Sequence, residues 1–169
     1  MQMQRLFVRT LCPLLVLVLG MLWIVSPGIA QEKEEKVEKS LYERLGGVYA
    51  IATVVDDFIE RLLTNDVLNA NSAINESRDR VPKAGLKFQV TALVCMATGG
   101  PIQYTGRSMK ESHKHLNITD KEWQVMAADF KMSLDKFKVP EKEQKELFAI
   151  VESTKGDIVV SSKGKGKKY

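Results

Sequence analysis

The sequence has few of the residues from which cross-links and metal clusters are built. Its 169 residues include two cysteines and two histidines, which excludes a disulfide framework and a zinc site made of cysteine pairs. It also lacks a phosphate-binding loop, a nucleophile elbow and an internal repeat. No segment alternates between apolar and polar residues for long enough to predict a β-strand. These absences favour an all-α domain whose chemistry depends on few polar side chains.

Positive charge is scarce in the body of the chain, although the net charge is +4. The first 30 residues carry +2 and the last nine carry +4, so that residues 31–160 carry −2. A protein that binds nucleic acid needs positive charge over its domain surface. We therefore expect no nucleic-acid partner. The Lys-rich segment 161–169 is expected to be a flexible tail that could contact a membrane or the cell envelope.

The N-terminus has the features of an export signal. Arg5 and Arg9 precede an apolar stretch, and the small residues of Ser26–Ala30 suit cleavage after Ala30. Residues 1–30 are therefore predicted to be a signal peptide, and the protein to be exported to a periplasmic or other extracytoplasmic location. The alternative is a retained membrane anchor, because no charge occurs over 22 residues. Residues 31–39, with four Glu and three Lys, form a charged spacer.

Apolar residues recur at helical spacing in the rest of the chain, so one helical domain is expected over residues 40–160. Ser40 is expected to cap a short helix that ends at Gly46-Gly47. Residues 65–80 are expected to be a long connection, because they are rich in Asn, Asp and Ser. Thr119 and Glu122 have capping-box spacing, and Pro140 suits the first turn of a last helix. One amphipathic helix is predicted over Val48–Thr64. The apolar stripes of the other predicted helices are Leu86, Val90, Leu93 and Ala97; Met109, His113 and Leu116; Trp123, Ala127, Phe130, Leu134 and Phe137; and Leu147, Ile150 and Val151.

The two histidines cannot serve one site together. His113 and His115 are two residues apart, about 200° around a helix. His113 shares a face with Met109 and Leu116, whereas His115 is expected to point to solvent. A neutral imidazole in an apolar interior is either a hydrogen-bonded core residue or an axial ligand for haem iron. Cys95, the cysteine left after signal cleavage, is expected to be a small buried hydrophobe.

Four motifs, in order, carry a resemblance to a known family. They are Ser40–Gly47 with its glycine pair, Asp57–Arg61, Gly99-Gly100-Pro101, and Tyr104-x-Gly106-x-x-Met109-x-x-x-His113. Together they resemble the truncated haemoglobins, and most closely their group 1 branch. The resemblance runs from about Leu41 to Ile158. It implies a two-over-two helical sandwich around haem.

The resemblance also implies site residues. His113 would be the proximal ligand of haem b, and Phe58 and Met109 would contact the macrocycle. Arg107 and Lys110 are plausible cationic partners for the haem propionates. The haem would be held non-covalently, because no C-x-x-C-H motif occurs. A diatomic gas (oxygen, nitric oxide or carbon monoxide) would be the ligand, and a redox partner is unidentified.

The distal side departs from the family. Most group 1 members have a tyrosine where this chain has Ile59, and a frequent glutamine is replaced by Val90. Leu86 is the other expected pocket residue. Gln89 flanks these two and is expected to meet water more readily than to swing inward. We therefore expect an unusually apolar distal pocket that favours nitric oxide or carbon monoxide over stable oxygen storage.

Two other functions remain open on this scaffold. One is a haem enzyme that handles nitric oxide or peroxide, for which the chain offers no distal histidine and no clear distal donor. The other is a haem-free helical interaction module, suggested by the altered segment 65–80.

Overall fold

The computed structural model describes residues 38–160, and all regular secondary structure in that range is helical. The predicted signal peptide, most of the spacer and the Lys-rich tail lie outside the described residues. No helix of the described range is long and apolar enough to span a membrane. The nine helices found there are α1 (Leu41–Arg44), α2 (Gly47–Thr64), α3 (Asp66–Asn69), α4 (Ser72–Arg80), α5 (Lys83–Ala97), α6 (Met109–His113), α7 (Asp120–Lys136), α8 (Glu141–Ser153) and α9 (Lys155–Ile158).

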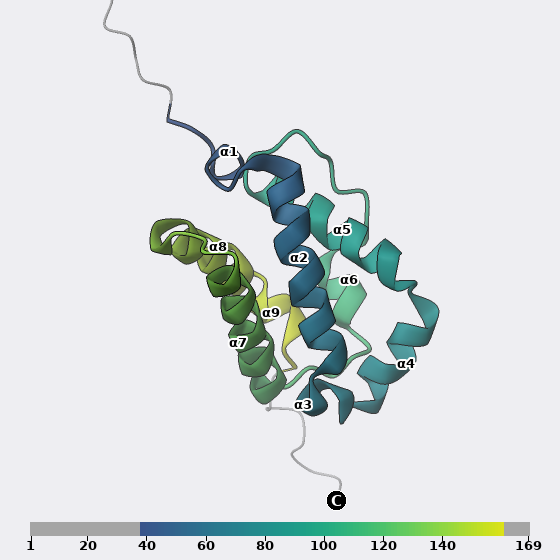
Figure 1. Ribbon diagram of the computed structural model, residues 1–169. Coiled ribbons are helices and arrows are strands. Elements are labelled where there is room, and N and C mark those ends of the chain that lie inside the picture. Colours follow the sequence, from purple (N-terminus) through teal and green to yellow (C-terminus); the bar gives the residue numbers. More distant parts are fainter. Residues whose placement is uncertain (1–37, 161–169) are drawn as a thin grey trace, which may run out of the picture. The chain divides into compact units, whose positions relative to one another are not determined.

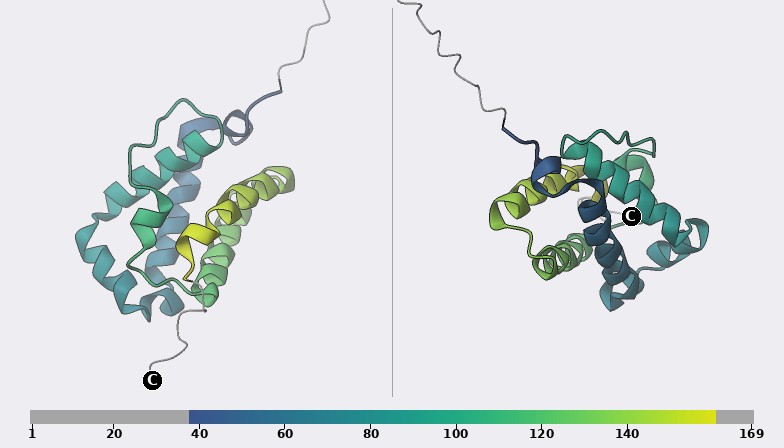
Figure 2. Two further views of the ribbon diagram at one scale, coloured as in Figure 1. Left: turned by 180° about the vertical axis from the view of Figure 1, so that it is seen from behind. Right: turned by 45° about the horizontal axis from the view of Figure 1, so that its top comes forward.

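Helix α2 is the centre of the arrangement and packs against both α5 and α7 (Figure 1). Two apolar clusters fill these junctions. One cluster joins Ile51, Val55 and Ile59 of α2 to Cys95 of α5. The other joins helices α1, α7 and α8 around Leu134, and Val54 and Phe58 of α2 pack against it. Helix α6 lies behind α5 in this view and in front of it from the opposite side (Figure 2). The described helices therefore pack around two apolar cores, and α2 contributes residues to both.

The short first helix is fixed by hydrogen bonds at its start and by ion pairs at its end. Ser40 and Glu43 form a capping box, which satisfies donors that a helix N-terminus leaves free. The guanidinium of Arg44 pairs with Glu143 at 2.8 Å and with Glu146, both on α8. Each end of α1 is therefore held, and the chain enters α2 in a defined direction.

Tyr42 lies close to one glycine of each glycine pair, Gly47 and Gly100. Gly47 has φ +78°, and the Tyr42 hydroxyl accepts a hydrogen bond from the Val48 backbone N–H (3.1 Å). A Cβ at Gly100 would lie 2.4 Å from the Tyr42 ring, a distance that no side chain tolerates. Gly100 therefore does more than end a helix, since its lack of a side chain lets the Tyr42 ring pack against the end of α5.

The prediction of a long connection over residues 65–80 is wrong, because the structure has α3 and α4 there. Their polar residues act as caps: Asn65 and Asn71 each accept a hydrogen bond from the first turn that follows. Arg78 of α4 donates to the backbone carbonyl oxygens of Leu62 (2.8 Å) and Leu63 (3.3 Å) at the end of α2. Asn and Asp, which favour loops, also favour helix starts, and only the folded chain distinguishes the two.

Three smaller expectations also change. Leu116 lies in the turn after α6, which ends at His113. Phe137 is the C-cap of α7 and is exposed, so it does not belong to the buried stripe of that helix. Pro140 is the N-cap of α8, one position before the first turn. The Thr119–Glu122 capping box is confirmed.

Candidate cofactor site

His113 is the last residue of α6, a helix of little more than one turn. Ser108 caps its start, where the hydroxyl accepts from the Glu111 backbone N–H at 3.2 Å. The Nδ1 atom of His113 lies 2.8 Å from the backbone carbonyl oxygen of Met109. Since a carbonyl oxygen only accepts, Nδ1 carries the proton and Nε2 has a free lone pair. A metal-binding imidazole needs this tautomer. His113 and Met109 are half-buried, whereas His115 is exposed as expected.

Helix α5 has apolar residues on opposite sides, and only one of these sides holds fully buried residues. Ala92, Cys95 and Thr98 are buried, with Cys95 fully so; we call this the packed face. The other side, about 180° away, holds the predicted stripe, and we call it the open face. It consists of Leu86, Val90, Leu93 and Ala97, of which the first three are half-buried and the last is exposed.

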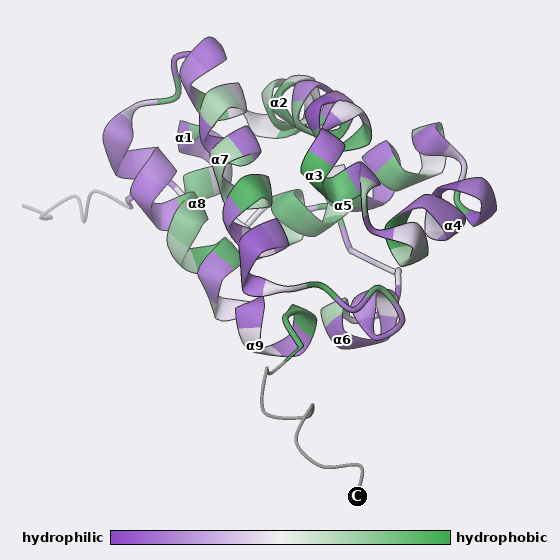
Figure 3. Ribbon diagram, turned by 90° about the horizontal axis from the view of Figure 1, so that it is seen from below, coloured by the Kyte–Doolittle hydropathy of each residue, from purple (hydrophilic) through white to green (hydrophobic). Residues whose placement is uncertain are grey.

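The open face is therefore an apolar surface that the described residues cover only in part. Leu86 and Val90 touch the edge of the α2 cluster, but Leu93 and Ala97 take part in neither cluster of the described chain. Figure 3 shows the molecule from below, and there α6 is drawn lower in the picture than α5. Helix α9 packs beside α6. An incompletely buried apolar helix face on one side and a histidine with a free Nε2 on the other fit a flat apolar group that has a metal at its centre.

Gln89 lies between the two faces, and the expectation that it meets water is wrong for its carbonyl oxygen. The side chain is half-buried, and Oε1 is buried without a hydrogen-bond partner in the described structure. An unpaired buried polar atom is costly, on the order of 1–3 kcal/mol. Such an atom is explained when a partner is supplied from outside the chain. The Gln89 carbonyl oxygen is thus enclosed by the protein and does not meet solvent.

Phe58 and Ile59 occupy adjacent positions of α2 with different surroundings. Ile59 is 2% exposed and belongs to the core between α2 and α5. Phe58 is half-buried and touches both clusters, and its ring centroid lies 5.2 Å from that of Phe130. Neither residue offers a hydrogen-bond donor, so this stretch of α2 contributes only apolar contacts.

Arg107 lies just before α6, Lys110 lies in its first turn, and both are exposed. Neither forms a salt bridge within residues 38–160, whereas Lys87 and Lys136 do. The Arg107 backbone carbonyl accepts from the Tyr104 hydroxyl at 2.6 Å, which fixes the turn that leads into α6. Both cations are therefore free, in the described structure, to pair with an anionic group near His113.

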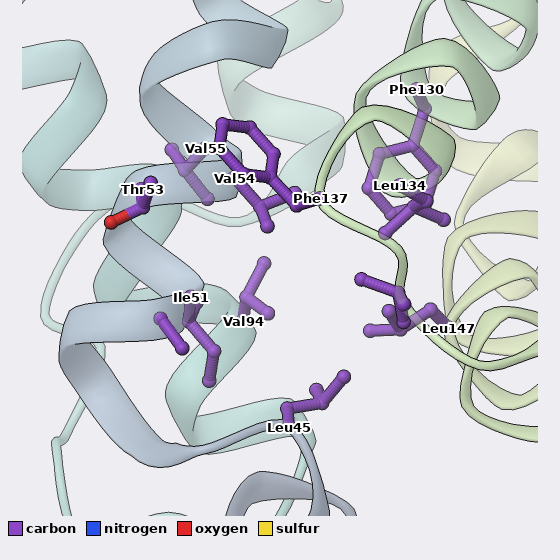
Figure 4. Close-up of a pocket in the computed structure, with 12 residues that line it drawn as sticks. Leu45, Ile51, Thr53, Val54, Val55, Val94, Phe130, Leu134, Phe137 and Leu147 are labelled. Carbon is purple, nitrogen blue, oxygen red and sulfur yellow. The ribbon is translucent and has the colours of Figure 1, made fainter.

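A separate apolar cavity of about 280 Å³ lies among α2, α5, α7 and α8 (Figure 4). None of the predicted site residues lines it. Phe130 of α7 and Val94 of α5 line this cavity. Its walls include Leu45, Ile51, Thr53, Val54, Val55, Phe137 and Leu147. The cavity opens to the surface beside the exposed Thr53 and Phe137, and it is distinct from the surroundings of His113.

The junction of α2 and α7 contains a polar cluster that the sequence did not indicate. Asp57 accepts hydrogen bonds from Arg61 Nε (2.8 Å), Ser133 Oγ (2.9 Å) and Lys136 Nζ. Burial raises the pKa of the Asp57 carboxyl, but these donors outweigh it and lower the pKa to about 2. Only the Asp57–Arg61 spacing of four residues was visible beforehand, because the α7 partners are 76 and 79 residues away.

Comparison with known proteins was made against families, sequences and solved structures. The model of the family described as bacterial-like globin matches residues 40–160. A group 1 truncated haemoglobin of Synechocystis is 33% identical over 106 residues, which cover 60% of this chain and 81% of the relative. A group 1 truncated haemoglobin of Mycolicibacterium paratuberculosis is 28% identical over 127 residues, covering 75% and 88%.

Solved structures give the same result for the fold. The truncated haemoglobin of Tetrahymena pyriformis in the Fe(III) form has a TM-score of 0.61 at 24% identity, covering 73% of this chain and 100% of that one. The 2/2 haemoglobin of Synechococcus, described with covalently attached haem, has a TM-score of 0.60 at 26% identity, covering 72% and 98%. The arrangement of α2, α5, α7 and α8 is therefore that of a 2-on-2 truncated haemoglobin.

Proposed function

The chain belongs to the bacterial-like globin family, which makes it a haem-binding globin, and from that premise we propose how its own residues do this. His113 Nε2 binds the iron of haem b, the open face of α5 covers the opposite side of the haem, and Phe58 and Met109 pack at its edge. Arg107 and Lys110 pair with the propionates. Bound in this way, haem supplies an iron coordination position for a diatomic gas.

The observation that carries this proposal is the hydrogen bond from His113 Nδ1 to the Met109 carbonyl oxygen at 2.8 Å. It fixes the tautomer, orients the ring and makes Nε2 more basic toward a metal. The exposed His115 lacks such a partner among the described hydrogen bonds, so the chain contains its own control. The Soret band of the full chain after haem reconstitution is expected to be lost in His113→Ala and unchanged in His115→Ala. Equal spectra for the two variants would contradict the proposal.

The distal side is proposed to be apolar except for Gln89. Rotation of its amide by 180° would present Nε2–H in place of the buried Oε1, and a single amide donor would then face the gas. Without a strong donor, bound oxygen loses a hydrogen bond worth about 1–3 kcal/mol, whereas carbon monoxide and nitric oxide depend less on one. The pocket is therefore expected to favour these two gases over stable oxygen storage.

A donor added to the open face tests this preference. Val90→Gln is expected to slow oxygen dissociation about 5- to 150-fold, which corresponds to the same 1–3 kcal/mol. Val90→Leu adds bulk without a donor and is the matched control. Oxygen and carbon monoxide dissociation rates, measured by stopped flow, should separate the variants. If both variants slow oxygen dissociation equally, the effect comes from packing, and the donor argument fails.

The haem is proposed to be held without a covalent bond. The described histidines are the proximal candidate and the exposed His115, and the Cys95 thiol is fully buried. Neither His115 nor Cys95 is suited to bond with a haem vinyl group in the pocket. Acidic extraction into an organic solvent should remove all haem from the chain. Haem that stays with the polypeptide on a denaturing gel would overturn this part of the proposal.

Export is proposed on the N-terminal pattern alone, and envelope association on the Lys-rich tail. Mass spectrometry of the mature protein should find a chain that begins at Gln31. Recovery of a chain that begins at Met1 in a membrane fraction would favour the anchor instead. Deletion of residues 161–169 should release the processed protein from anionic vesicles if the tail makes the contact.

A further inference from the structure

Asn71 connects three segments of the fold through one side chain. As the N-cap of α4, its Oδ1 accepts hydrogen bonds from the backbone N–H groups of Ala73 (3.0 Å) and Ile74 (3.4 Å). Its Nδ2 donates to the backbone carbonyl oxygen of Leu116 (2.9 Å) and to Glu122 Oε1 (2.7 Å). Both donors and the acceptor of the amide are in use, so the side chain has no freedom to rotate.

The carbonyl that Asn71 binds belongs to the turn directly after His113. The Leu116 backbone N–H donates to the His113 carbonyl oxygen at 2.9 Å. A chain of three hydrogen bonds therefore runs from the peptide of His113, through Leu116 and Asn71, to the first turn of α4. Helix α4 leads through Val81-Pro82 into α5. The turn after α6 and the start of α4 are thus joined at the lower end of the molecule in Figure 1, where α7 begins, and α4 connects this point to α5, the other wall of the proposed haem pocket.

Glu122 makes this junction rigid. The residue is buried, and its Oε2 accepts from the backbone N–H (2.7 Å) and the hydroxyl (2.6 Å) of Thr119. Burial raises the pKa of the Glu122 carboxyl, but the hydrogen bonds from Thr119 and Asn71 outweigh it and hold that pKa below its usual value. The bond from Asn71 is consequently charge-assisted and stronger than a neutral one.

We propose that Asn71 is a positioning residue that sets the distance between the α5 wall and His113. This inference rests on the proposed function, because it assigns Asn71 a role toward the haem that His113 would bind. Loss of its two donated bonds lets the turn after α6 move relative to α4. His113 then holds its ligand less firmly, although the helices remain folded.

Substitutions can separate this role from helix capping. Asn71→Ser and Asn71→Asp both keep an oxygen that caps α4, but neither can donate to Leu116 and Glu122 as Asn71 does. Haem transfer to a scavenging apomyoglobin is expected to be about tenfold faster in both variants. A tenfold change corresponds to the free energy that one charge-assisted hydrogen bond contributes. The iron–histidine stretching frequency in resonance Raman spectra of the ferrous protein is expected to shift.

A polarity swap tests the link to Leu116 itself. In Asn71→Asp combined with Glu122→Gln, the new amide donates to the new carboxylate, so the α4–α7 bond and the capping box return. The bond to the Leu116 carbonyl does not return. We expect the swap to restore the unfolding midpoint and to leave haem transfer fast. If the swap restores both, Asn71 is only a structural tie, and the proposal is overturned.

The capping box of α1 is the matched control. Glu43 accepts from the backbone and hydroxyl of Ser40 as Glu122 does from Thr119, but it has no third partner comparable to Asn71 among the described hydrogen bonds. Glu43→Gln should leave haem transfer unchanged, whereas Glu122→Gln should accelerate it. Equal effects of the two substitutions would contradict the proposal.

Hydrogen exchange in the haem-free chain separates this inference from the proposed function. Backbone amides of residues 113–118 are expected to exchange about tenfold faster in Asn71→Ser than in the parent. If the parent refuses haem but this difference is found, the proposed function fails and the positioning role of Asn71 over the turn stands. If exchange does not change, the proposal fails whatever the chain binds.

Discussion

The two faces of α5 are similar in composition and opposite in their surroundings. On the packed face, Cys95 is fully buried against Ile51, Val55 and Ile59 of α2. On the open face, Leu93 is half-buried and Ala97 is exposed. An apolar helix face is expected to be covered, and α5 has two such faces. The difference indicates that the protein completes only half of this helix's environment, and we assign the other half to haem.

The largest effect is expected from a charge on the packed face. Cys95→Lys buries an ammonium without a partner and overfills the α2 contact, so unfolding should become easier by more than about 3 kcal/mol. Ala97→Lys carries the same charge on the open face near a helix C-terminus, where it should be tolerated. Urea unfolding of the haem-free chains measures both. Similar losses in the two variants would mean that the faces do not differ.

A polar substitution on the open face should act on haem more than on folding. Leu93→Asn is expected to speed haem release about 10- to 100-fold, or about 1.4–2.8 kcal/mol, because it presents an amide to an apolar ligand. The haem-free chain should lose less than about 1.5 kcal/mol of stability. Met96→Asn, on an exposed side of the same helix, is the control and should release haem at the parent rate. Faster release from Met96→Asn than from Leu93→Asn would move the haem to another side of α5.

The α2–α7 junction should affect folding without affecting haem. The carboxyl of Asp57 has a folded pKa of about 2 against an ordinary value of 3.8. Its contribution is therefore fully present above pH 3.8 and is lost as the pH falls toward 2. Asp57→Asn should lower the free energy of unfolding by about 1–2 kcal/mol near neutral pH. This difference in stability between variant and parent should disappear in acid. A gap that persists at pH 2, or faster haem release at neutral pH, would contradict this account.

The smallest effect is expected where α2 and α5 meet at the surface. Lys87 pairs with Asp56 (2.5 Å) and Glu60 (2.6 Å). Exposed ion pairs contribute about 0–1 kcal/mol and are screened by salt. Lys87→Met should therefore lower the free energy of unfolding by less than about 1 kcal/mol, and it should not change it at high salt. Thermal melts at two ionic strengths measure this, and a large salt-independent loss would show that the pair holds the two helices together.

The sequence predicted most of the fold because apolar spacing and helix caps are local. Thr119 and Glu122 form the capping box that their spacing indicates, and α2, α5 and α7 lie within a residue or a few of the predicted segments. The failure over residues 65–80 has the same local origin, since Asn65 and Asn71 are as suitable for helix caps as for loops. Their role became visible only with the helices that they start.

The site could be predicted only in part, because its decisive contacts join distant segments. The spacing around His113 indicated a proximal ligand, but not the tautomer that the Met109 carbonyl selects. Gln89 was expected to meet water, but its position beside the Leu86/Val90 stripe does not decide the direction of its side chain, and its Oε1 is buried in the structure. The tie between Asn71 and Leu116 spans 45 residues, and no local pattern in the sequence indicates it.

Imidazole rescue tests the central claim most directly. In His113→Gly, the space of the ring is empty, and added imidazole can reach the iron only if the histidine ring occupied that coordination position. The account predicts that His113→Gly lacks the Soret and visible bands of the parent and that millimolar imidazole restores them, with His115→Gly unchanged throughout. A His113→Gly chain that keeps the parent spectrum without imidazole would contradict the account, because another residue would then hold the haem.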